Sequence, residues 1–154
     1  MDGAMEIQSI ALKRHPASAP EATFDELTIS MGLCDSETLS TTFDDNYIPG
    51  TETVVLQATD YTVTAPTPDA WFYVDLDTPY WYNGDDNLII EVEWPGGNGS
   101  LYAYHWQTGS DRALKARFGQ STGTLEQSLP NMLLTGPLNF DQESFGSIKS
   151  ILVH

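Results

Sequence analysis

The sequence predicts an all-β domain, an antiparallel β-sandwich of the jelly-roll kind with eight or nine strands. Apolar and polar residues alternate in several short segments, most clearly over residues 27–33. Gly, Pro, Asn and Asp separate these segments at short intervals, as turns require. No clear helical periodicity interrupts the first 135 residues. A chain of 154 residues suits one domain, which we place at residues 1–135, followed by a tail at residues 136–154 that docks or pairs with a neighbour.

Each expected strand follows from its own alternation between two turn signals. The Ser-, Thr- and Asp-rich stretch 35–46 indicates a loop with one helical turn, and residues 51–64 are long enough for one or two strands. Near residue 104, three aromatic side chains alternate with smaller ones, and we expect the aromatic side, Tyr102, Tyr104 and Trp106, in the core. The predicted strands cover residues 6–15, 24–34, 51–64, 70–77, 87–94, 100–107, 112–119 and 129–134.

The charge of the chain excludes two classes of partner. Acidic residues outnumber basic ones by 22 to 6, the net charge is −16, and no Lys or Arg lies between Arg14 and Arg112. Such a chain repels nucleic acid and anionic lipid, so we expect neither nucleic-acid binding nor membrane insertion. Residues 1–20 lack the basic start and apolar middle of a signal peptide, so an exported protein would have its leader missing from this sequence.

Four segments, at residues 7–14, 39–46, 78–92 and 130–131, carry a resemblance to known modules that spans most of residues 7–134. Residues 78–92 read TPYWYNGDDNLIIEV, and residues 39–46 read LSTTFDDN. Both resemble segments of the β-sandwich modules in secreted bacterial surface proteins that carry PEP-CTERM sorting or type IX secretion signals. The resemblance implies an extracellular or cell-surface β-sandwich of uncharacterised function. It assigns no catalytic residues.

Aromatic and acidic residues alternate along residues 71–77 and 87–94. If these two strands pair as a hairpin, one face gathers the side chains of Trp71, Tyr73, Asp75, Glu91 and Glu93. Aromatic rings stack on the apolar faces of sugars, and carboxylates accept hydrogen bonds from sugar hydroxyls. The face is therefore a candidate carbohydrate-binding site, with an ordinary solvated sheet face as the simpler alternative.

Two acidic loops are candidate calcium sites. One contains Asp44, Asp45 and Asn46, and the other contains Asn83, Asp85 and Asp86. Calcium takes roughly six to eight oxygen ligands, which carboxylates, amides and backbone carbonyls supply. Asp and Asn are also the commonest turn residues, so turns alone are the simpler explanation of both loops. Structural Ca²⁺ is the one cofactor that the residues suggest.

The residues favour a non-catalytic binding or adhesion module outside the cell, with a glycan or another cell-surface molecule as its partner. The alternative is a structural subunit that forms homo-oligomers through strand addition by its tail. A third hypothesis is a small secreted glycosidase that uses two carboxylates from among Asp75, Asp77, Glu91 and Glu93. No motif indicates a particular reaction, so we expect no enzyme activity.

Overall fold

The computed structural model describes residues 3–137 and 150–153, and it confirms the all-β prediction. Within these ranges the chain forms more strands than the eight or nine predicted, because its second half folds into several short ladders. One 3-10 turn, Asp44–Asn46, lies in the predicted loop. The strands are β1 (Met5–Lys13), β2 (Glu21–Cys34), β3 (Thr53–Thr64), β4 (Trp71–Tyr82), β5 (Asn87–Glu93), β6 (Gly97–Asn98), β7 (His105–Gln107), β8 (Ala113–Lys115), β9 (Thr124–Glu126), β10 (Ser128–Pro130), β11 (Met132–Thr135) and β12 (Ser150–Val153).

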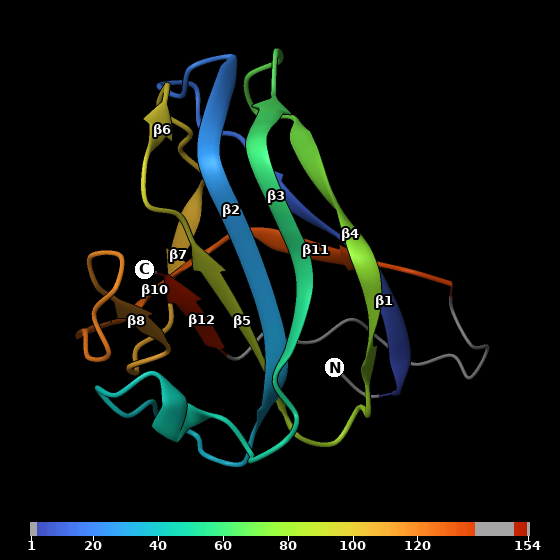
Figure 1. Cartoon of the computed structure of the whole chain (residues 1–154), viewed down its shortest axis with the longest axis vertical. Coiled ribbons are helices and arrows are strands. Elements are labelled where there is room, and N and C mark those ends of the chain that lie inside the picture. The colour runs from blue at the N-terminus through green and yellow to red at the C-terminus, as the bar shows by residue number, and fades with distance from the viewer. Residues whose placement is uncertain (1–2, 138–149, 154) are drawn as a thin grey trace.

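Two sheets stack on each other (Figure 1). The small sheet has the strand order β11-β1-β4, and the large sheet has the order β3-β2-β5-β12-β8-β9, with β6 paired to the end of β2. A separate two-stranded ladder joins β10 to β7. Both ladders of the small sheet are antiparallel, whereas β12 runs parallel to β5 and β8.

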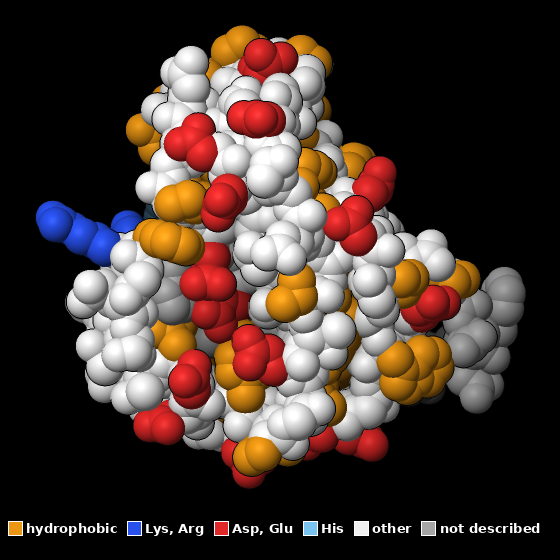
Figure 2. All heavy atoms as spheres, viewed as in Figure 1, with side chains coloured by type: hydrophobic (Ala, Val, Ile, Leu, Met, Phe, Trp, Pro, Cys, Tyr) orange, Lys and Arg blue, Asp and Glu red, His pale blue; other side chains and the backbone are white. Residues whose placement is uncertain are grey.

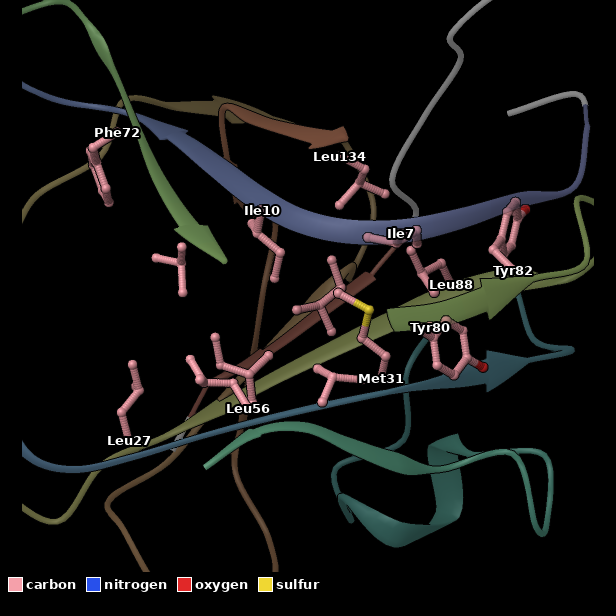
Figure 3. Packing of buried hydrophobic residues seen from close by; sticks show 14 of the residues in the cluster. Ile7, Ile10, Leu27, Met31, Leu56, Phe72, Tyr80, Tyr82, Leu88 and Leu134 are labelled. Atoms are coloured by element: carbon pink, nitrogen blue, oxygen red, sulfur yellow. The ribbon is translucent and has the colours of Figure 1, made fainter. Parts of the chain in front are cut away.

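The core lies between the two sheets (Figure 3). Alternate residues of β1, β2, β4 and β5 point inward, and Ile7, Met31 and Ile90 have no solvent-exposed surface. Residues 27, 29 and 31 all lie in this core, as their alternation predicts. Burial of these side chains is the main stabilising contribution that holds the sheets together.

Strand β4 is longer than its predicted range of residues 70–77. It continues through Pro79 to Tyr82, because Tyr80 and Tyr82 are buried against the core. A proline cannot donate a ladder hydrogen bond, but β4 is the terminal strand of the small sheet, where one side of the backbone needs no partner.

The expected orientation of residues 100–107 is wrong. Tyr102 is 54% exposed and Trp106 is 48% exposed, whereas Leu101 packs against the core. The reason is the bridge between Ala103 and Arg14, whose side chain is buried. Directly opposed residues share a side of an antiparallel ladder, so Ala103 faces inward and its aromatic neighbours face outward.

The last described residues of the tail pair within their own chain. β12 lies between β5 and β8, with Ile151 opposite both Ile90 and Ala113. Of the predicted tail, residues 138–149 and residue 154 lie outside the described residues. Over the part of the chain that the structure describes, no helix has the length and apolar character to cross a lipid bilayer.

Arg14 connects three segments at the end of β1. Its side chain is 5% exposed, and its guanidinium donates hydrogen bonds to the carbonyl oxygens of Pro66 at 3.1 Å and Ser18 at 2.5 Å. Its backbone N–H donates to the carbonyl of Ala70, which precedes β4. The residue therefore fixes the loop that follows β1 and the loop between β3 and β4.

Candidate functional site

The predicted aromatic and acidic face does not form as one surface. Strand β4 pairs with β1 in the small sheet, whereas β5 pairs with β2 in the large sheet, so the expected hairpin between β4 and β5 is wrong. The loop after Tyr82 carries the chain from one sheet to the other. Trp71, Tyr73 and Asp75 consequently lie on the outer side of the small sheet, and Glu91 and Glu93 lie on the outer side of the large sheet.

Glu91 is buried beneath the loop that precedes β3. The hydroxyl of Tyr47 donates a hydrogen bond to Glu91 Oε2 at 2.7 Å, and Glu91 is 7% exposed. Figure 2 shows other Asp and Glu side chains spread over this side of the molecule. Burial of the phenol raises the pKa of Tyr47, and the negative charge of Glu91 raises it further. Glu91 therefore holds this loop in place. A ligand bound to Trp71 and Tyr73 on the small sheet would not contact it.

Replacing Tyr47 by Phe is expected to make the free energy of unfolding fall less steeply as the pH rises above about 10. The raised pKa means that the folded protein keeps a proton that the unfolded chain releases near pH 10, so the stabilisation is complete below about pH 10 and is lost as the pH rises further. Urea unfolding at a series of pH values above neutrality measures this slope. An identical slope in both proteins would contradict the assignment.

Trp71, Tyr73 and Asp75 remain together on the outer side of the small sheet, beside residues of β1. Trp71 lies opposite Lys13, and Tyr73 lies opposite Ala11, so these side chains project from the same side. Tyr73 is 57% exposed, and Trp71 is half-buried. We name the surface of Lys13, Trp71, Tyr73 and Tyr104 the aromatic face.

Tyr104 joins this face from the segment that follows β6. The Nζ atom of Lys13 lies 5.7 Å from the centre of the Tyr104 ring, and the His15 ring meets the same ring edge-on at 5.0 Å. The Tyr104 hydroxyl donates a hydrogen bond to Asp69 Oδ1 at 2.5 Å, which raises the pKa of Tyr104. Sequence reasoning misses Tyr104 because it assigns the larger aromatic side of residues 100–107 to the core.

Polar groups lie beside the rings. Asp75 is exposed and opposite Ser9 in the ladder, and the Ser9 hydroxyl is hydrogen-bonded to the hydroxyl of Thr135. Together with Asp69, they place carboxylates and hydroxyls within one or two residue positions of the aromatic side chains. The arrangement can stack on an apolar surface and accept hydrogen bonds at its border.

Comparisons with known proteins leave the family open. No family model, curated protein or solved structure matches the chain. The resemblance of residues 39–46 and 78–92 to bacterial surface modules therefore stays a prediction.

The two predicted calcium loops are organised by hydrogen bonds of their own. The Asn46 carboxamide is buried, accepts from the Ser40 N–H at 2.7 Å and donates to the Thr42 carbonyl at 2.7 Å. The Asn83 carboxamide accepts from the N–H groups of Asp85 and Asp86 at 3.1 and 3.2 Å.

Asp44 and Asp45 are exposed in the 3-10 turn. Among the residues that the structure places, no three His, Cys, Asp or Glu side chains gather into a group that could hold a metal ion. Calcium binding by either loop stays a prediction.

Proposed function

We propose that the chain is a non-catalytic binding or adhesion module of an extracellular or cell-surface protein, and that its aromatic face binds a glycan. The observation that carries the proposal is the grouping of Trp71, Tyr73 and Tyr104 around Lys13 on one side of the small sheet. Exposed aromatic patches of this kind tend to be interaction sites on soluble proteins.

The chemistry of the face suits a sugar chain. Trp71 and Tyr73 are two residues apart on β4, which separates their side chains by about 7 Å. Tyr104 lies across β1 from Trp71, two strand positions away, which corresponds to about 10 Å. Rings distributed in this way can each stack on the apolar face of a pyranose, so the face suits several consecutive sugar rings better than one enclosed monosaccharide.

The charges on and around the face narrow the class of glycan. Asp69 and Asp75 lie at its border, and the whole chain carries a net charge of −16. Lys13 is the one cation among the four described residues that make up the face, and the two carboxylates together with the net charge of the chain outweigh it, so polyanionic sugars are repelled. Carboxylates accept hydrogen bonds from neutral hydroxyls. Neutral polysaccharides are therefore the expected ligands.

Binding of neutral polysaccharides is expected to depend on Trp71 and Tyr73. A glycan array identifies the ligand, and calorimetry then compares Trp71→Ala and Tyr73→Ala with the unchanged protein. Each substitution is expected to weaken binding at least about tenfold, which corresponds to about 1.4 kcal/mol, because a central stacking ring is removed.

Trp81→Ala is the matched control for these two variants. Trp81 is 55% exposed and projects from the same side of β4, but it lies opposite Glu6 at the far end of the strand. Its removal should leave the affinity unchanged. An array without any signal, or equal affinities for all three variants, would exclude the aromatic face as a glycan site.

A further inference from the structure

A pocket of about 410 Å³ opens at the side of the sandwich, where the segment of residues 97–103 crosses from its pairing with β2 to its bridge with Arg14, just beyond the end of β1. We name it the side pocket. Leu12 and Met132 line it from the small sheet, and Phe24 and Val92 line it from the large sheet. Leu101 closes it from the crossing segment. The volume lies within the usual range for small-molecule sites in proteins, about 300–1,000 Å³.

The side pocket adjoins the interior of the sandwich. A second cavity of about 80 Å³ is also lined by Leu12, Phe24, Val92, Leu101 and Met132, so these side chains form a wall that the two cavities share. Every residue lining this inner cavity within the described part of the chain has an apolar side chain. A cavity of this composition has no groups that could hydrogen-bond a water molecule, so its preferred occupant is a hydrocarbon group.

The mouth of the side pocket is polar but uncharged. Thr23, Asn98 and Ser100 line it, and Asn98 is directly opposite Thr23 in the ladder between β6 and β2. Gly97 makes this close approach possible, since a Cβ atom there would lie 2.3 Å from the Thr23 carbonyl oxygen. Trp94 completes the wall through an edge-to-face contact with Phe24, with ring centres 6.0 Å apart.

We propose that the side pocket binds a neutral amphiphile, with its alkyl chain in the apolar interior and an uncharged polar head at the mouth. Among the described residues that line either cavity, none is a Lys, Arg, Asp or Glu. An anionic head would find no cationic partner there and would be repelled by a chain of net charge −16. This site is separate from the aromatic face, because Trp71 and Tyr73 do not line it.

Displacement of a neutral fluorescent probe tests the proposal. N-phenyl-1-naphthylamine is bound to the whole chain and displaced by 1-hexanol, 1-octanol and 1-decanol. Affinity is expected to rise about fourfold per added methylene until the chain fills the cavity, because each buried methylene contributes about 0.8 kcal/mol. Decanoate, which has the same chain length and an anionic head, should bind at least about tenfold more weakly than decanol.

Two variants locate the binding. Leu101→Phe adds volume where the two cavities meet and should weaken decanol binding at least about tenfold, with a smaller effect on hexanol. Met132→Phe narrows the same junction from β11 of the small sheet. It replaces Leu101→Phe in this test if that variant does not fold.

The control is Tyr73→Ala, which lies on the aromatic face and should leave alcohol binding unchanged. Affinity that is independent of chain length, equal binding of decanoate, or full affinity in both cavity variants would overturn the proposal. Tyr73→Ala should weaken glycan binding and leave alcohol binding unchanged. Each proposed site can therefore be rejected without affecting the other.

Discussion

Replacing Ile90 by Ala is expected to lower the free energy of unfolding by about 2–5 kcal/mol. Ile90 has no exposed surface and lies in β5, in the interior of the large sheet between β2 and β12. Strands on both sides hold its backbone, so the surrounding residues cannot collapse into the space that the missing atoms leave. The loss therefore contains a cavity contribution in addition to the lost hydrophobic burial.

Chemical denaturation with urea measures this difference. Val54→Ala is the control, because Val54 is an aliphatic residue of the same sheet that is 50% exposed, and its loss should change stability by less than about 0.5 kcal/mol. Similar values for the two variants would show that β5 is not at the centre of the core.

Replacing Arg14 by Ala is expected to lower the free energy of unfolding by about 3 kcal/mol. The substitution removes both donors to the carbonyl oxygens of Ser18 and Pro66, in a region where Arg14 itself is buried. A buried acceptor without a donor retains its desolvation cost, about 1–3 kcal/mol. The Nε atom of Arg14 has no hydrogen-bond partner among the described residues, which offsets part of the effect.

Arg14→Lys separates hydrogen bonding from charge. A lysine keeps the positive charge but lacks the planar fork that reaches two carbonyl oxygens at once, so it should recover less than half of the loss. Thermal unfolding of the unchanged protein, Arg14→Ala and Arg14→Lys gives their order of stability. Full recovery by lysine would show that charge, and not the geometry of the two hydrogen bonds, determines stability at this position.

Alternation predicts the class of fold because it reports on solvent contact along one strand. Residues 27, 29 and 31 all enter the core as expected. The same signal misplaces the end of β4, since Pro79 is incompatible with a central strand and compatible with a terminal one. Whether a strand lies at the edge or in the centre of its sheet depends on its partner strands, and its own sequence does not determine this.

The candidate site shows the same limit. Alternation correctly groups Trp71, Tyr73 and Asp75 on one side of β4, but it contains no information on the neighbouring strand. Glu91 and Glu93 were expected beside them because a short loop joins β4 to β5, and that loop crosses between sheets. The side pocket could not be predicted at all, because its walls come from four separate stretches of the chain, at residues 12, 22–24, 92–102 and 130–132.

The position of β12 has a consequence for the order of folding. Residues 150–153 occupy the space between β5 and β8, and their partners in β5 come some sixty positions earlier in the chain. Contacts across such a separation form late, because a long loop must close first. Until they form, β5 and β8 both present free backbone donors and acceptors along one edge. That interval of folding is when two molecules can exchange strands, and its duration depends on how fast residues 150–153 reach their place between β5 and β8.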